Sequence, residues 1–146
     1  MTLNERQRLF TLHEANALIP ALQRSLDEYL RHKEACERLH DYYLMDELIR
    51  QREAPAAGSE ERLEREAMTL DESAAAMRRV IDSIRSLGCL VRHPEKGIVE
   101  FPSERRGERV FLCWRRGESA IRYFRRARTA EFAPDSLELI PSAEEN

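Results

Sequence analysis

The chain has 146 residues, the size of one domain and enough to bury a core without disulfides or metal. Hydrophobic residues make up 42% and charged residues 35%, a charge-rich but globular composition. The net charge of -3 gives no whole-chain reason to expect binding to nucleic acid or anionic lipid. No apolar run reaches the roughly 18 residues of a membrane span, and MTLNERQRLF lacks a signal-peptide core. We therefore expect a cytoplasmic protein with no membrane partner.

Three cysteines, Cys36, Cys89 and Cys113, lie far apart in the chain, and none belongs to a C-x-x-C pair. An odd number at this spacing argues against a disulfide framework and against a cysteine zinc site. The sequence also lacks a Walker loop, a dinucleotide-binding fingerprint and a G-x-S-x-G nucleophile motif. We therefore expect a non-enzymatic protein without a cofactor.

The first helix begins at a capping signal in FTLHEANALIPAL, where Glu14 stands three residues after Thr11. The side chains of such a capping box satisfy backbone N–H groups that the first turn leaves without partners. Pro20 lacks an N–H, so a short opening helix should be followed by a long helix from near Pro20 to about Arg52. The apolar residues of the long helix recur at spacings of three and four: Ile19, Leu22, Leu26, Tyr29, Cys36 and Tyr43.

A second helix is predicted after the connector EAPAAGS, residues 53–59, and should end at Gly88. Its apolar positions follow the 3.5-residue period of a left-handed coiled coil: Leu63, Ala67, Leu70, Ala74, Met77, Ile81 and Ile84. A short connection between two long helices makes them antiparallel neighbours. Residues 1–88 are therefore predicted to form a coiled-coil-like helical hairpin.

From Cys89 onward the apolar period changes to two. Glycine-containing turns separate four segments, CLVRH, IVEFPSE, RVFLCWR and AIRYFRR, which is typical of an antiparallel β-meander over residues 89–128. Residues 129–146 form a tail with a short last strand in SLELIP. The predicted fold class is α+β, a helical hairpin followed by a small antiparallel sheet, with residues 1–146 forming a single domain.

Alternation assigns the side chains of the third strand to two faces of the sheet. One face carries Val110, Leu112 and Trp114, and the other carries Phe111, Cys113 and Arg115. In FLCWRRGESAIRYFRRAR, residues 111–128, we expect the rings to turn mainly to the core and the arginines mainly to water.

Two blocks of the sequence resemble a bacterial family, the domain-of-unknown-function family 2203. The first is F-T-L-x-E-A-N-x-L-I-P at residues 10–20, and the second is LGCLVRHPEKGIVEFPS with VFLCWRRGE, within residues 87–118. The resemblance covers nearly the whole chain and strengthens the predicted fold. It implies no reaction, cofactor or ligand.

The family pattern differs from this chain after the aromatic pair. In the family a histidine often follows that pair, and a glycine-rich G-F-x-G-R segment closes the domain. Arg125 stands at the place of that histidine, and the closing glycines are absent from YFRRARTAEFAPDSLEL. An activity carried by that segment in relatives would therefore be absent or different here.

The leading functional hypothesis is a non-enzymatic interaction module that forms a homodimer through its hairpin. Lys33 and His40 interrupt the apolar stripe of the long helix. The long helix by itself therefore does not cover the whole apolar seam of the second helix. A second copy, or another protein partner, would cover what remains exposed. The residues expected at this self-association surface are Leu63, Leu70, Met77 and Ile81.

Nucleic-acid binding is the less favoured alternative. Residues 89–128 contain eleven Lys or Arg against five Glu, interleaved with aromatic rings that could stack on bases. The candidate phosphate-binding residues are Arg115, Arg116, Arg122 and Arg126. The same arginines would equally suit an acidic protein surface or the acidic tail of the chain.

Metal or small-ligand binding near Cys36 and His40 is a third hypothesis. The two residues are four apart on one helix, so they could share a metal, with Asp71 or Glu72 of the facing helix completing the site. Without a recognisable motif, packing of Cys36 as a small apolar residue is the favoured interpretation. Cys113 could act as a nucleophile only beside a basic group and with solvent access, and mid-strand cysteines usually fill the core.

Overall fold

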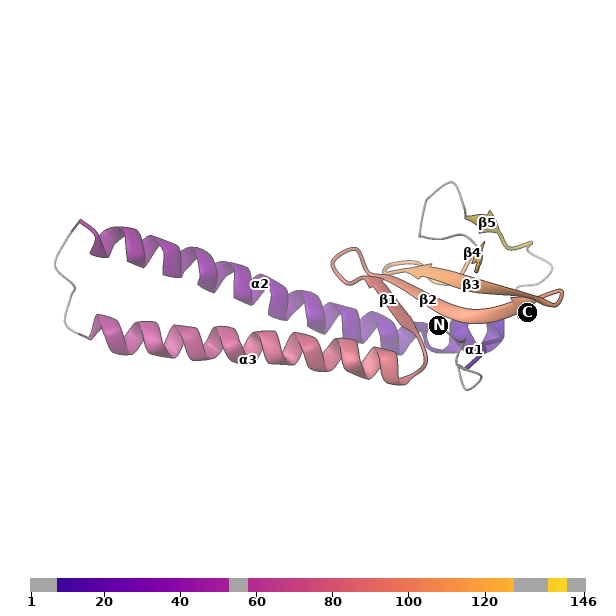
Figure 1. The fold of residues 1–146 in the computed structure, drawn as a ribbon, viewed down its shortest axis with the longest axis horizontal. Helices are drawn as coiled ribbons and strands as arrows, with labels where there is room; N and C mark the ends of the chain where they lie inside the picture. Colours follow the sequence, from indigo (N-terminus) through magenta and orange to yellow (C-terminus); the bar gives the residue numbers. More distant parts are fainter. Residues whose placement is uncertain (1–7, 53–57, 128–136, 142–146) are drawn as a thin grey trace. The chain divides into compact units, whose positions relative to one another are not determined.

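The computed structural model describes residues 8–52, 58–127 and 137–141. Its contacts divide the chain, which we expected to form a single domain, into two compact units: residues 1–26 with 81–146, and residues 27–80. The first unit contains a five-stranded antiparallel sheet and the second is helical, which confirms the α+β class (Figure 1). None of the described helices combines the length and apolarity needed to cross a membrane.

The opening helix α1 (Leu12–Ala17) begins at the predicted capping box. The Glu14 N–H donates to Oγ1 of Thr11 (3.1 Å), and the Thr11 N–H donates to the Glu14 carboxylate (3.0 Å). Helix α2 (Ile19–Arg50) follows, with Pro20 as its second residue, where a missing N–H costs no intrahelical hydrogen bond. The predicted break between a short and a long helix is confirmed.

The sheet is a meander whose neighbouring strands are all antiparallel. Its strands, in spatial and chain order, are β1 (Leu90–His93), β2 (Ile98–Arg105), β3 (Glu108–Arg115), β4 (Tyr123–Arg126) and β5 (Glu138–Leu139). The predicted four strands and the last strand of the tail are therefore confirmed. Gly97, in the β1–β2 turn, has φ +68°, and a Cβ there would lie 2.4 Å from the Cβ of Arg116. Only glycine suits this close approach of two turns.

One face of the sheet, which we call the inner face, packs against the N-terminal segment and α1. The Phe10 ring meets Phe101 edge-on at 5.2 Å, and the Phe10 N–H donates to the carbonyl of Pro102 (2.7 Å). Oδ1 of Asn16 in α1 accepts a hydrogen bond from the Ile121 N–H (2.9 Å). The inner face carries the predicted residues Val110, Leu112 and Trp114, all of them buried, so that half of the face assignment is confirmed.

The second unit contains residues 27–50 of α2 and residues 59–80 of α3 (Ser59–Ser86), which run antiparallel (Figure 1). Leu63 and Ser73 are buried in α3, whereas Ala67 and Ala74 are only half-buried. Of the predicted seam, Leu63 and Ile84 are buried and the other five residues are half-buried, while Ser73 and Val80, each one residue before a predicted position, are buried as well. Spacings of three-four and four-three share a seven-residue period, and apolarity alone favoured alanine over serine.

Candidate functional site

The outer face of the sheet, opposite α1, buries a group of charged side chains. Glu100 on β2 is 0% exposed and Arg125 on β4 is 3% exposed. The Arg125 Nε donates to Oε2 of Glu100 (2.5 Å), and its Nη2 donates to Oε1 (3.0 Å). Nε of Arg92 on β1 donates to Oε1 as well (2.5 Å). We call these three residues the buried ion cluster.

Aromatic packing completes the surroundings of the buried ion cluster. The guanidinium carbon of Arg125 lies 4.5 Å from the centroid of the Phe111 ring, and that of Arg92 lies 5.8 Å from it. The negative face of the ring attracts both cations. Burial alone would raise the pKa of Glu100, but the hydrogen bonds and charges of Arg125 and Arg92 outweigh it and lower that pKa below 4.5. Glu100 is therefore an anion at neutral pH.

Cys113 on β3 lies between the two arginine-bearing strands, and its thiol points at the same carboxylate. Its Sγ lies 3.5 Å from Oε2 of Glu100. Burial and the Glu100 charge both raise the pKa of the Cys113 thiol, and burial raises that of Cys89 to about 11. Because the thiolate is the reactive form, neither cysteine is an activated nucleophile at neutral pH.

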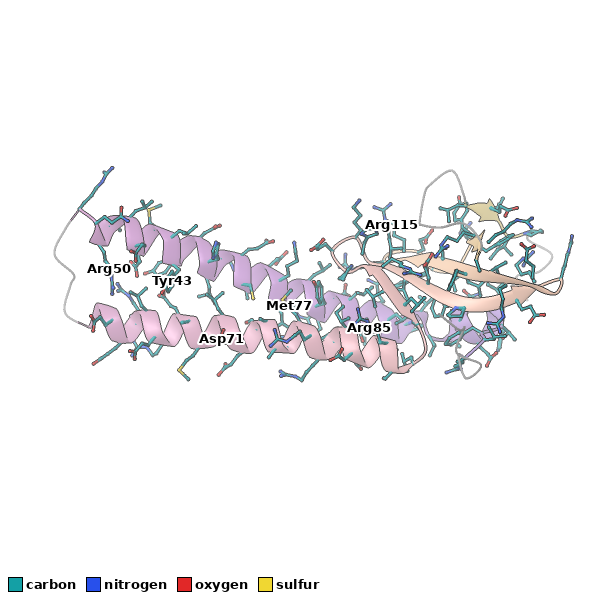
Figure 2. The ribbon with its side chains drawn as sticks, viewed as in Figure 1. Tyr43, Arg50, Asp71, Met77, Arg85 and Arg115 are labelled. Carbon is teal, nitrogen blue, oxygen red and sulfur yellow. The ribbon has the colours of Figure 1, made fainter. Side chains whose placement is uncertain are left out.

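A pocket of about 410 Å³ adjoins Cys113 on the sheet unit. Its buried wall includes Ile98 and Cys113, and its exposed rim includes Lys96 and Arg115. Glu118 also lines the pocket. Its carboxylate accepts a hydrogen bond from the Arg115 backbone N–H (2.7 Å) and so closes the β3–β4 turn. Figure 2 labels Arg115 on this unit.

The structure does not gather the four candidate phosphate-binding arginines on one face. Arg115 pairs in register with Ile98, whereas Arg126 pairs with Val110 of the inner face. Arg126 is half-buried and bonded to the carboxylates of Glu108 (2.7 Å) and Glu138 (2.9 Å), so its charge is already matched. Arg116 lies in the turn after β3, and Arg122 precedes β4; both are exposed.

The expectation that the arginines of residues 111–128 turn mainly to water needs correction at two positions. Arg125 is buried rather than exposed, and Arg126 is half-buried in ion pairs. Conversely, Tyr123 is 38% exposed on the outer face, opposite Cys113. The reason is Glu100: a carboxylate buried on the outer face requires a cation beside it, and Arg125 supplies that cation.

The structure brings no third ligand to the candidate metal pair. Cys36 is half-buried and His40 is exposed on α2, and Asp71 and Glu72 are both exposed on α3. Among residues 8–52, 58–127 and 137–141, no group of three His, Cys, Asp or Glu side chains is arranged to hold a metal ion.

The end of α2 shows an inverted polarity. Its side facing α3 carries Asp46, which pairs with Arg62 of α3 (3.5 Å), and Arg50, whose Nη2 is buried. Figure 2 shows Tyr43 and Arg50 directed toward α3. The remaining surface of this helix end is apolar and about half exposed: Tyr42 50%, Leu44 50%, Met45 58%, Leu48 56% and Ile49 49%. We call these five residues the α2 apolar surface.

The residues predicted for self-association lie elsewhere. Leu63 is buried, and Leu70, Met77 and Ile81 are half-buried on α3. Figure 2 shows Met77 between α2 and α3, so it serves packing within the hairpin. The large exposed apolar area is on α2 instead.

These observations define a protein in which a helical hairpin is joined in sequence to a small antiparallel meander. The described residues contain no recognisable catalytic centre. Residues 8–131 match the family described as "Uncharacterized conserved protein (DUF2203)", and the chain belongs to that family. No curated protein and no solved structure matches it.

Sequence reasoning missed both the buried ion cluster and the α2 apolar surface. Glu100 stands in IVEFPS, where every residue proves buried, so an acidic residue inside an apolar strand was the available signal. YYLMDELI, residues 42–49, has six apolar residues in eight, more than one packing stripe can bury. That excess was the signal for a second surface.

The buried ion cluster predicts unequal effects of removing its two arginines. Arg125→Gln leaves the buried Glu100 with one half-exposed cation, and we expect a loss of about 3–5 kcal/mol in the free energy of unfolding. Arg92→Gln removes a side chain that is 40% exposed, and should cost under about 1 kcal/mol. Urea unfolding of the two variants measures both values. Equal losses would contradict the assigned roles.

The lowered pKa of Glu100 predicts a pH dependence of stability. Its folded-state pKa lies below the ordinary value of 4.5, so between those two values the unfolded chain binds more protons. The stabilisation is complete above about pH 4.5 and is lost as the pH falls through the folded pKa. Glu100→Gln should therefore flatten the acid limb of a plot of unfolding free energy against pH. Glu104→Gln, at an exposed position of the same strand, is the matched control for the loss of one carboxylate.

Proposed function

We propose that the protein is a non-enzymatic interaction module that forms a homodimer by packing the α2 apolar surface against that of a second copy. The observation that carries this proposal is the inverted polarity of the helix end, with charged groups toward α3 and five large apolar side chains toward solvent. A contiguous exposed patch of this kind marks an interaction site more often than a free surface.

The geometry of a helix makes the α2 apolar surface continuous. At about 100° per residue, the five side chains cover an arc of about 160° on the side away from α3. The middle of that arc carries Asp41, Met45 and Leu48, spaced four and three, and Arg52 follows in the turn after α2 ends. This is the spacing of a seam that packs against another helix.

Charge favours a second copy, placed antiparallel, as the occupant. Asp41 and Arg52 end the seam with opposite charges, both are exposed, and neither has an ion pair within the described part of the chain. In a twofold arrangement centred between Met45 and Leu48, Asp41 of each copy lies opposite Arg52 of the other. The same register places Leu44 opposite Ile49, so apolar groups meet apolar groups along the contact.

The small size of the α2 apolar surface indicates how tightly the proposed dimer would bind. Five half-exposed side chains per copy form a small interface, and interfaces below about 1,200 Å² are usually weak or transient. We therefore infer a reversible dimer with a micromolar dissociation constant.

The free thiols of Cys36, Cys89 and Cys113 suit a reducing compartment, which supports a cytoplasmic location.

Introducing a charge on the α2 apolar surface should abolish the dimer without unfolding the protomer. Leu48→Glu places a carboxylate in the centre of the contact, while Leu48 is 56% exposed within one copy. Sedimentation velocity across a concentration series should show monomer–dimer exchange for the wild-type chain and only monomer for Leu48→Glu. Met68→Glu on α3, 62% exposed and outside the α2 apolar surface, is the matched control and should still dimerise. A wild-type chain that stays monomeric at high micromolar concentration contradicts the proposal.

A charge exchange tests the antiparallel register. Asp41→Arg and Arg52→Asp should each weaken the dimer by about tenfold, because two symmetric ion pairs become two repulsive contacts worth together about 1–2 kcal/mol. The double variant restores both pairs with reversed sign and should recover most of the affinity. Failure of the double variant to recover any affinity, with both single variants weakened, would show that the helices meet in another register.

A further inference from the structure

The pocket beside Cys113 has the size and lining of a small-molecule site. Its volume of about 410 Å³ lies in the lower part of the roughly 300–1,000 Å³ typical of such sites. Its lining is mainly apolar, and the residues that supply apolar atoms include Ile98, Tyr123 and Leu137. These residues come from β2, β4 and the position just before β5, so the pocket is built by the sheet unit alone.

Two cations stand at the rim of the pocket. Ile98 pairs in register with Arg115, and Lys96 lies two residues before Ile98, so both cations belong to the same end of the sheet. Both residues are exposed, and neither side chain has an ion pair among the residues that the structure describes. The carboxylate of Glu118 at the same rim is bonded to the Arg115 backbone N–H. The rim therefore has a net charge of +1.

The opposite, buried side of the pocket carries no charged side chain among the described residues that line it. The thiol of Cys113 lies there, and behind it is the carboxylate of Glu100, 3.5 Å from Sγ. The thiol has two acceptors away from the pocket, the Glu100 carboxylate and the Phe111 carbonyl, both 3.5 Å from Sγ. The cations at the rim would thus attract an anionic head group, whereas the apolar atoms of the buried end suit an apolar body.

We propose that this pocket binds a small organic anion, an aromatic or branched aliphatic carboxylate, with its head group at Lys96 and Arg115 and its apolar body against Ile98, Tyr123 and Leu137. This binding site is independent of dimer formation, since it uses the sheet unit and not the α2 apolar surface.

A pair of probes with the same naphthyl body, one with an anionic and one with a neutral head group, tests the proposal. Titrating the full chain with 2-naphthoate, and separately with the neutral 2-naphthalenemethanol, is followed by amide NMR shifts. We expect saturable binding of 2-naphthoate at one site, with the largest shifts at residues 96–98, 113–118 and 123. The alcohol should bind at least about fivefold more weakly, because it lacks the charge that the rim attracts.

Two rim variants and one control locate the charge effect. Lys96→Gln and Arg115→Gln should each weaken 2-naphthoate binding by about fivefold and leave 2-naphthalenemethanol binding unchanged. Arg109→Gln removes one exposed positive charge from the same strand at a position that does not line the pocket, and should change neither affinity. Each substituted side chain is exposed, so all three variants should fold.

Three outcomes would overturn the proposal: no saturable binding of 2-naphthoate at millimolar concentration, equal binding of the two probes in wild type and both rim variants, or shifts confined to residues 42–49. The last result would show that the naphthyl ring binds the α2 apolar surface instead.

Discussion

The structure of the sheet depends on one carboxylate, that of Glu100. A fully buried charge is tolerated only with partners close by. The partners of Glu100, which lies on β2, are Arg92 on β1 and Arg125 on β4. Because β3 lies between β2 and β4, the Arg125 side chain reaches diagonally across β3, from its place opposite Phe111 to Glu100, which is opposite Cys113. A slip of one residue on any of these strands would turn Glu100 or Arg125 to the inner face. The buried ion cluster therefore specifies register across four strands.

The same charge governs the chemistry of its surroundings. Burial, and after it the Glu100 charge, raises the pKa of the Cys113 thiol, so this side chain is not an activated nucleophile at neutral pH. The Cys113 thiol has acceptors at Glu100 and at the Phe111 carbonyl, so it is not a free donor on the buried wall of the pocket. The pocket is apolar inside and cationic at the rim. This arrangement is the one on which the proposed binding of a small organic anion rests.

Local signals in the sequence were sufficient for the secondary structure and insufficient for the functional surfaces. The Thr11–Glu14 capping box, Pro20 and the period-two strands are short-range patterns, and all are confirmed. The partnership of Glu100 with Arg125 spans 25 residues and depends on two strand registers. Sequence reasoning expected the arginines of residues 111–128 to turn mainly to water and made no prediction for Glu100. The apolar neighbours of Glu100 in IVEFPS signal a buried carboxylate, but no short-range pattern identifies the cation that pairs with it.

At the end of the hairpin, polar groups lie between the two helices and large apolar groups lie at the surface. Asp46 pairs with Arg62, and the Nη2 atom of Arg50 and the Oε2 atom of Glu66 are buried as well, in a part of the hairpin where Leu or Ile would be expected. Buried polar groups stabilise a hairpin less than an apolar seam would. The apolar residues of YYLMDELI then have no place inside and remain at the surface. A helix end selected only for stability would have the opposite arrangement, and this difference is the observation on which the proposed dimer rests.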